Sequence, residues 1–171
     1  GHRDEALGRR LKQIQNGFGA ILGPQDSFLI SRGMKTLAVR LDAQQQSALQ
    51  IANWLEKHPA IRKVHYPGLA SHPGREIHEK QARGSGAVIS FELADGPSAV
   101  AFLKRVKLPL VAVSLGGVES ILSYPVTMSH ASIPRPEREA RGITDRLVRL
   151  SVGLEAAEDL IADLGQALAS A

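Results

Sequence analysis

The clearest local signal in the chain is the segment AVISFEL, Ala87–Leu93, in which apolar and polar side chains alternate. Successive side chains of a β-strand point to opposite faces of the sheet. The odd-numbered residues are apolar and share one face, while Ser90 and Glu92 lie on the other. The segment therefore predicts a strand that covers a hydrophobic core with one face and exposes polar groups on the other.

A second segment with this pattern is LVRLSV, Leu147–Val152. Its even-numbered residues are apolar and share one face, so Arg149 lies on the opposite face with Leu147 and Ser151. An arginine held on a rigid strand can bind a carboxylate through two parallel N–H donors. The same position also suits an ordinary surface arginine on an exposed sheet face, and the spacing alone leaves both interpretations open.

Two further strands are predicted at Ile61–Tyr66 and Leu108–Val113. Helices are predicted where apolar residues recur every three or four positions. They are Asp4–Gln15, a second helix that passes through Ile30–Gly33 and continues from Lys35 to Lys57, a third that starts at Asp95-Gly96-Pro97 and ends near Val106, a short charged helix within Pro134–Glu139, and Glu155–Leu168. The apolar face of the second helix consists of Leu37, Leu41, Ala48, Ala52 and Leu55.

These elements predict an α/β (α+β) fold. Strands separated by helices and by short links favour a mixed or antiparallel sheet of about four strands with helices packed on one side. The chain has 171 residues, of which 43% are hydrophobic and 22% charged, as is usual for a globular domain with a real core.

Composition excludes several kinds of site. The chain has no cysteine, so disulfides, thiolate zinc sites and cysteine nucleophiles are absent. Its six histidines lack the spacing of a metal site, and we expect no metal. No apolar run reaches the ~18 residues of a membrane span. The net charge is only +4 and 4% of residues are aromatic, which argues against a nucleic-acid binder.

The turn Ser114-Leu115-Gly116-Gly117 directly follows a predicted strand. Two glycines allow the backbone to turn sharply and to bring N–H groups close to a ligand, and the serine adds a hydroxyl. Such a turn suits a carboxylate or a phosphate. The same residues also suit a plain turn at the end of a strand.

Five segments together carry a resemblance. They are FLISRGMKTL (Phe28–Leu37), YPGLASHP (Tyr66–Pro73), SLGGVES (Ser114–Ser120), MSHA (Met128–Ala131) and LVRLSVG (Leu147–Gly153). In this order they closely resemble the pyridoxal-phosphate (PLP)-dependent trans-sulfuration enzymes of cysteine and methionine metabolism. That family includes cystathionine β-lyase, cystathionine γ-lyase, cystathionine γ-synthase, methionine γ-lyase and O-acetylhomoserine sulfhydrylase.

The resemblance implies the small C-terminal domain of the aspartate-aminotransferase-like fold (type I PLP fold). Residues 1–20 would be an N-terminal linking helix, and residues 21–171 the domain that binds the substrate carboxylate. The Schiff-base lysine, the other cofactor-binding residues and the large PLP-binding domain are expected outside this chain. Lys35 matches a family position of its own that is not the Schiff base. The chain alone is therefore expected to be inactive.

The resemblance also implies site residues. Arg149 would bind the substrate α-carboxylate together with Ser114 and Leu115. Val113 and Ser129 would line the pocket. Several γ-synthases and γ-lyases of this family look to carry glutamate where this chain has Val113, which looks more like cystathionine β-lyases of the plant type and methionine γ-lyases. We therefore expect an enzyme similar to cystathionine β-lyase.

The same resemblance suggests a cytoplasmic enzyme that acts on an amino acid such as cystathionine and assembles as a homotetramer. Within the family, γ-lyase, γ-synthase or sulfhydrylase chemistry is the alternative. Outside enzymes, the alternatives are an isolated binding or interaction domain and a basic nucleic-acid binder. We expect neither nucleic acid nor membrane as a partner.

Overall fold

The computed structural model describes residues 3–94 and 99–169. The chain divides into two compact units, Gly1–Ala38 and Val39–Ala171. The first holds the helices α1 (Glu5–Phe18) and α2 (Pro24–Met34), and α3 (Leu37–Lys57) begins at its end and continues into the second. The boundary expected at residue 20, between a linking helix and the carboxylate-binding domain, stays a prediction.

The helices of the first unit have identifiable ends. Asp4 caps α1 by accepting hydrogen bonds from the amides of Ala6 (2.9 Å) and Leu7 (3.1 Å). The helix runs past its predicted end at Gln15 because Gly17 costs a helix only about 1 kcal/mol; it ends at Gly19, whose φ is +67°. The prediction of one second helix that passes through Ile30–Gly33 and continues to Lys57 was wrong. Pro24 starts α2, and α3 begins separately at Leu37.

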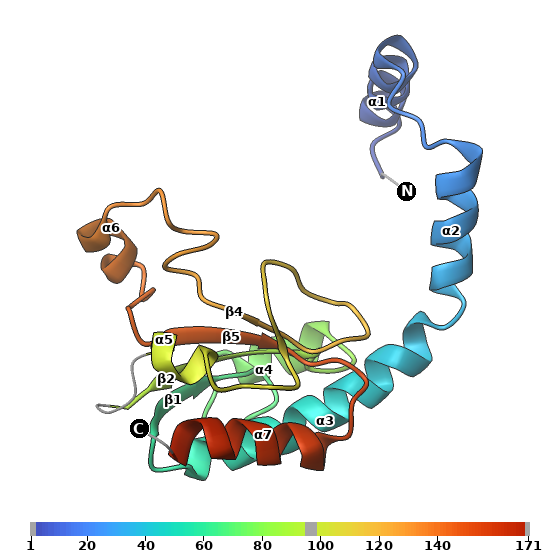
Figure 1. The fold of residues 1–171 in the computed structure, drawn as a ribbon. Helices are drawn as coiled ribbons and strands as arrows, with labels where there is room; N and C mark the ends of the chain where they lie inside the picture. The colour runs from blue at the N-terminus through green and yellow to red at the C-terminus, as the bar shows by residue number, and fades with distance from the viewer. Residues whose placement is uncertain (1–2, 95–98, 170–171) are drawn as a thin grey trace. The chain divides into compact units, whose positions relative to one another are not determined.

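The second unit is built on a five-stranded mixed sheet with the order β1-β2-β5-β4-β3 (Figure 1). The strands are β1 (Ile61–His65), β2 (Val88–Leu93), β3 (Leu110–Val111), β4 (Ile121–Ser123) and β5 (Leu147–Ser151). β3 and β4 pair in parallel, and the other neighbours are antiparallel. The mixed α/β sheet is confirmed, with one strand more than predicted.

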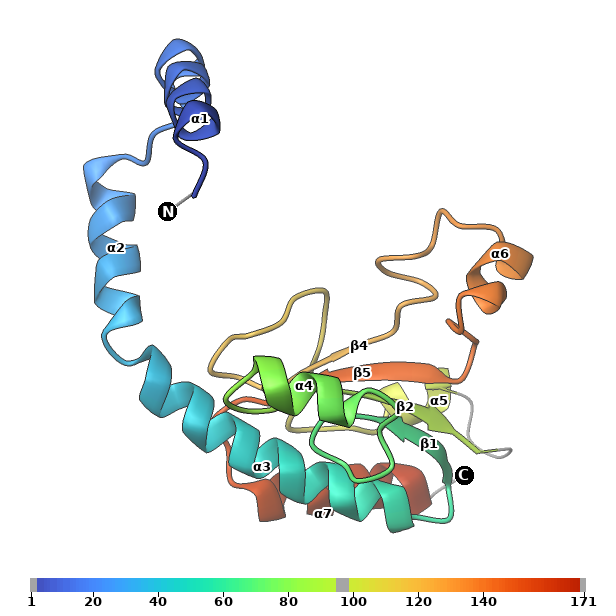
Figure 2. The same ribbon diagram turned by 180° about the vertical axis from the view of Figure 1, so that it is seen from behind.

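The hydrophobic core lies between the sheet and the helices α3 and α7 (Ala157–Ala169), which run along the same face of the sheet (Figures 1 and 2). Phe91 on β2 and Leu150 on β5 point into it and are fully buried. Phe91 meets the ring of Phe102 edge-on, with ring centres 5.9 Å apart. The apolar residues that alternate along β2 and β5 are therefore those buried against these helices.

The remaining helices are short. α4 (Arg75–Gln81) lies in the segment between β1 and β2, and α5 (Ala99–Leu103) ends earlier than the predicted Val106. The predicted start of that helix at 95–97 lies outside the described residues. α6 (Arg135–Ala140) is the predicted short charged helix. None of the helices in the described ranges is long and apolar enough to cross a membrane.

Two predictions about the β3–β4 region were wrong. β3 pairs over only Leu110 and Val111, because the amide of Leu108 donates instead to Asp163 Oδ2 at 3.0 Å. β4 was missed altogether: its three residues are all buried, so they show no alternation of apolar and polar side chains. Its position is fixed by pairing with β3 and β5 rather than by a pattern of its own.

The apolar face predicted for α3 is correct only in its second half. Ala48, Ala52 and Leu55 are fully buried, whereas the side chains of Leu37 and Leu41 are more than 40% exposed. The buried face of α3 begins at Gln44 and contains Gln44, Ala48, Ile51, Ala52 and Leu55. A glutamine thus occupies a position on the core side of this helix.

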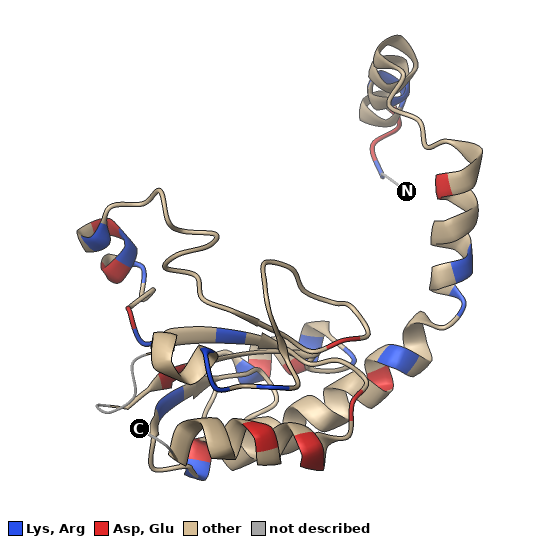
Figure 3. Ribbon diagram, viewed as in Figure 1, with Lys and Arg blue, Asp and Glu red and all other residues tan. Residues whose placement is uncertain are grey.

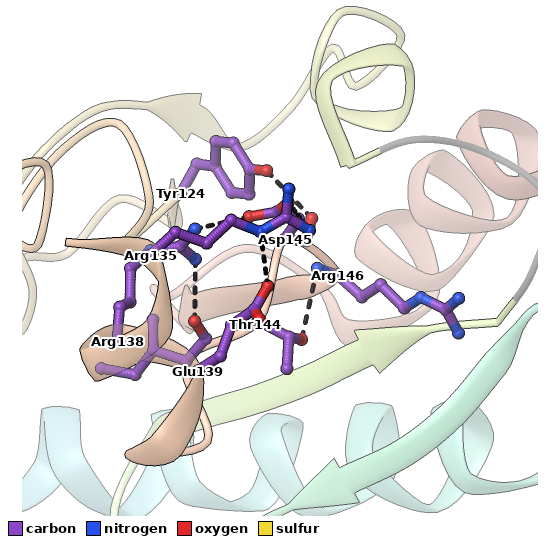
Figure 4. A network of polar contacts seen from close by, with 8 residues as sticks. Tyr124, Arg135, Arg138, Glu139, Thr144, Asp145 and Arg146 are labelled. Carbon is purple, nitrogen blue, oxygen red and sulfur yellow. Dashed lines mark hydrogen bonds and ion pairs between the residues drawn. The ribbon is translucent and has the colours of Figure 1, made fainter.

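An ion pair between the buried Arg138 and the partly exposed Asp145 fixes α6. Figure 4 shows Tyr124, Arg135 and Arg138 gathered around Asp145. Arg138 is 5% exposed and donates from Nη2 to Asp145 Oδ1 at 2.7 Å and from Nη1 to Ile143 O at 2.8 Å. Arg135 Nη2 lies 3.1 Å from the other carboxylate oxygen of Asp145. The hydrogen bond from Arg138, aided by the charges of Arg135 and Arg138, lowers the pKa of Asp145.

Charges of both signs are interspersed in the second unit (Figure 3). α6 alone carries Arg135, Glu137, Arg138 and Glu139, and the first turn of α7 carries Glu158 and Asp159. Acidic residues there are favoured by the positive end of the helix dipole. Neither α6 nor α7 therefore forms a continuous basic surface.

Gly153 is predicted to tolerate no side chain. A Cβ there would lie 2.4 Å from Val118 O and 2.5 Å from the carbonyl carbon of Glu119, both backbone atoms. We expect Gly153→Ala to lower the free energy of unfolding by about 2–3 kcal/mol and Tm by about 5–10 °C. The matched control is Gly165→Ala in α7, whose Cβ would meet an indole carbon at an ordinary 3.5 Å. Equal melting of the two variants would contradict the prediction.

The lowered pKa of Asp145 sets a pH dependence. A carboxyl whose pKa is lower in the folded state stabilises the fold above its unfolded pKa of about 4, and this contribution is lost as the pH falls through the folded value. We expect Asp145→Asn to lower Tm at pH 7, and the gap to the parent to narrow between pH 4 and pH 3.

The control for this series is Glu137→Gln, which removes an exposed ion pair between α6 and Arg141, the residue that follows this helix. Exposed pairs contribute little, so its Tm should change by much less than that of Asp145→Asn at pH 7. Thermal melts from pH 3 to pH 7 measure both variants. A gap for Asp145→Asn that does not change over this range would show that the ion pair does not stabilise the fold.

Candidate functional site

Arg149 stands at the centre of the sheet, on β5. Directly opposite it are Ser90 on β2 and Ser123 on β4. Its neighbours Val148 and Leu150 are fully buried in the core, so Arg149 projects from the opposite side. We call this side, which carries Ser90, Ser123, Arg149 and Ser151 and lies opposite α3 and α7, the loop face. The predicted orientation of Arg149 is confirmed.

The guanidinium of Arg149 is hydrogen-bonded through Nη2 but not through Nε. Nη2 donates to Ser114 O at 2.8 Å and to Ser123 Oγ at 3.0 Å. Nε is buried and has no hydrogen-bond partner in the described part of the chain. Leaving a buried donor unpaired costs about 1–3 kcal/mol, and more for a charged group. Among acceptors, a carboxylate has the geometry that a guanidinium binds best, so the role predicted for Arg149 is compatible with this arrangement and stays a prediction.

The Ser114–Gly117 turn is tied to the sheet at several points. Gly116 has φ +79°, a left-handed conformation that favours glycine, and its amide donates to Ser151 Oγ at 2.9 Å. Gln44 of α3 donates from Nε2 to Gly117 O at 2.7 Å and to Val152 O at 3.0 Å. Since Gln44 is 2% exposed, these bonds are shielded from water, and the turn is held in one position.

The connection between β3 and β4 explains why the turn meets Arg149. Two parallel strands can be joined only by a segment that returns along the sheet. Here the returning segment, residues 112–120, contains the turn. It rises on the loop face (Figures 1 and 2) and comes back at Gly117 to α3, where Gln44 binds its carbonyl oxygen. Its far end is anchored by Glu155, whose carboxylate accepts from the amide and the hydroxyl of Ser120, both at 2.8 Å.

Of the predicted site residues, the structure brings Ser114 and Arg149 into contact. Val113 and Leu115 adjoin Ser114, and Ser129 lies in a different segment. Ser114 contacts Arg149 through its carbonyl oxygen. Val113 and Leu115 flank Ser114 in the turn, and their side chains are 68% and 54% exposed. Ser129 lies on the segment after β4, where its hydroxyl is 2.8 Å from His130 Nδ1. A place for Ser129 in the substrate pocket stays a prediction.

Sequence reasoning missed three residues that shape this site: Ser123, Ser151 and Gln44. Ser123 lies on the strand that was not predicted, and Ser151 was placed on the correct face without a role. Gln44 left a usable signal, because it stands three residues after Leu41 and four before Ala48, within the apolar stripe of its helix. A polar residue in such a stripe is expected to have buried hydrogen-bond partners.

Comparison with known proteins identifies the family. The family described as "Cys/Met metabolism PLP-dependent enzyme" matches residues 2–169. The chain is 57% identical over 166 residues to the cystathionine beta-lyase MetC of Bacillus subtilis (strain 168), covering 97% of this chain and 43% of that protein. It is 51% identical over 162 residues to the cystathionine gamma-lyase of the same organism, covering 95% of this chain and 43% of that protein.

A solved structure gives the same result. The crystal structure of cystathionine gamma-lyase from Lactobacillus plantarum complexed with L-serine matches this structure with a TM-score of 0.92 at 45% sequence identity, covering 98% of this chain and 44% of that one. The chain thus spans less than half the length of the relatives that it matches. It belongs to the family of Cys/Met metabolism PLP-dependent enzymes, and its sequence and fold are those of the C-terminal domain of a trans-sulfuration enzyme.

Proposed function

We propose that this chain holds the substrate α-carboxylate in a PLP-dependent carbon–sulfur lyase of the cystathionine β-lyase kind. The observation that carries the proposal is the guanidinium of Arg149, which is fixed through Nη2 and has a buried Nε without a partner among the described residues. Two N–H groups of one guanidinium match the two oxygens of a carboxylate. The family and the relatives named as cystathionine lyases support an amino acid as the ligand.

The described residues do not fit the cofactor itself. PLP needs a lysine for its aldehyde and a cradle of donors for its phosphate, and in the described ranges no lysine takes part in the hydrogen bonds around Arg149 and the Ser114–Gly117 turn. Lys35, a candidate for the lysine that binds the PLP aldehyde, is the residue that caps the C-terminal end of α2. PLP supplies an electron sink when bound. We propose that its binding residues lie outside these 171 residues and that the chain alone is inactive.

The role of these residues is positioning. Arg149 receives the α-carboxylate through its unpaired N–H groups, while the bond to Ser114 O holds the turn against it. A substrate fixed through its carboxylate can rotate less about its Cα, so the Cα–H bond is presented in one direction. The two hydrogen bonds of Gln44 hold the turn against α3 and the end of β5.

The choice between β- and γ-directed chemistry rests on Val113. Its exposed isopropyl group cannot pair with the ammonium group that cystathionine presents at its distal end in either pose, whereas the glutamate expected at this place in several γ-synthases and γ-lyases can. This supports β-lyase chemistry with Val113, Leu115 and Ser129 around the substrate. The 51% identity to a cystathionine gamma-lyase keeps γ-lyase chemistry as the second candidate. Pyruvate from cystathionine would mark the first, and 2-oxobutyrate the second.

The wider expectations for the whole enzyme remain proposals as well. They are a homotetramer and a cytoplasmic location. A PLP titration of the 171-residue chain, with borohydride reduction and peptide mapping, separates the proposal from a catalyst complete in itself. No specifically labelled lysine is expected, and stoichiometric labelling of Lys35 would overturn the cofactor assignment.

Arg149→Lys in the full-length enzyme is the direct test of the carboxylate clamp. Lysine keeps the positive charge but loses the planar fork. We expect KM for cystathionine to rise by about 30- to 100-fold, because the contact made by two parallel charge-assisted hydrogen bonds is lost, with the fold intact by thermal melting. The control is Arg62→Lys on β1, an exposed arginine. Unchanged KM in Arg149→Lys, or an equal effect of both variants, would refute the role of Arg149.

A further inference from the structure

Ser123 is built into the sheet at the position next to Arg149. It is the last residue of β4, it is paired in register with Arg149, and it is 4% exposed. A hydroxyl group buried to this extent needs at least one hydrogen-bond partner, and Ser123 has two. Both partners of Ser123 belong to the candidate site.

The direction of these hydrogen bonds is fixed by chemistry. Ser123 Oγ donates to Ala112 O at 2.7 Å and accepts from Arg149 Nη2 at 3.0 Å. A serine hydroxyl has one proton, and here the carbonyl oxygen of Ala112 receives it. Toward Arg149, Ser123 is therefore an acceptor only, which is what a guanidinium requires.

The two bonds close a ring that includes the start of the turn. Arg149 Nη2 also donates to Ser114 O at 2.8 Å, and Ser114 follows Ala112 by two residues. Ala112 is tied to β4 by a second bond, from its amide to Leu122 O at 3.1 Å. Ser123 thus links the guanidinium to the same short segment of backbone that the guanidinium itself binds.

We propose that Ser123 is a positioning residue that fixes the guanidinium of Arg149 in the orientation that receives the substrate α-carboxylate. The inference rests on the proposed function of Arg149. Ser123 and Ser114 O occupy Nη2, and the remaining N–H groups are thereby left for the ligand. Without Ser123, Nη2 loses one of its two acceptors, and Ser114 O alone then holds the guanidinium.

Ser90 provides a matched control. It is also a serine, it lies on the other neighbouring strand, and it is likewise in register with Arg149. No hydrogen bond joins its side chain to Arg149 among the described contacts. A residue that merely fills space beside Arg149 would behave like Ser90, whereas a positioning residue would not.

The test uses the full-length enzyme with Ser123→Ala, Ser90→Ala, Arg149→Lys and the double variant Ser123→Ala/Arg149→Lys. Steady-state kinetics with cystathionine give kcat and KM. Inhibition constants for L-alanine and for L-alaninamide, which lacks the carboxylate charge, report carboxylate binding separately. Thermal melting and the absorbance of bound PLP confirm that each variant is folded and loaded.

We expect Ser123→Ala to raise KM and the inhibition constant of L-alanine by about tenfold, the size of one lost hydrogen bond to a charged group. The inhibition constant of L-alaninamide and the values of Ser90→Ala should stay within about twofold of the parent, well below that effect. The double variant should be little worse than Arg149→Lys, because the two residues act as one unit.

Other outcomes overturn the inference in distinguishable ways. Equal weakening of L-alanine and L-alaninamide, additive losses in the double variant, or equal effects of Ser123→Ala and Ser90→Ala would reduce Ser123 to a structural residue while Arg149 keeps its role. If Arg149→Lys itself leaves KM unchanged, the proposed function fails, and the inference fails with it.

Discussion

The parallel pairing of β3 with β4 is the constraint on which the site depends. A strand can be followed by a parallel neighbour only if the chain first returns along the sheet. In many α/β proteins a helix makes this return, but here residues 112–120 do so without one. The returning backbone is thereby carried over the loop face, where Arg149 projects from the central strand, and its carbonyl and amide groups become available to side chains of β4, β5 and α3.

Much of the fold could be predicted because its central strands are half buried. β2 and β5 each have one face against α3 and α7, so apolar and polar residues alternate along them. β3 and β4 could not be predicted in the same way. β3 is a two-residue edge strand, and β4 is buried on all its residues. The position of such short strands is fixed by pairing with strands that can lie far away in the sequence, and this pairing leaves no local pattern of apolar and polar residues.

The candidate site, too, could be predicted only in part. The period of two placed Arg149 on the correct face, and the Gly-Gly turn pointed to a backbone that could approach a ligand. The partners of Arg149 are different in kind, because each is brought to it by tertiary structure. Ser123 sits on the unpredicted strand, and Gln44 reaches the turn from α3. Of these, only the glutamine, as a polar residue on an apolar helix face, could have been found from the sequence.

The hydrogen bonds of Gln44 also have a consequence for the folding of the domain. They join residues 73 and 108 positions apart in the chain, and closing loops of such length carries a large entropic cost before any contact is gained. The turn is held in its final shape by contacts that exist only where α3 lies against the turn and the end of β5. Competence to hold a ligand therefore depends on contacts between segments far apart in the sequence, and it is a property of the completely folded domain rather than of any of its parts.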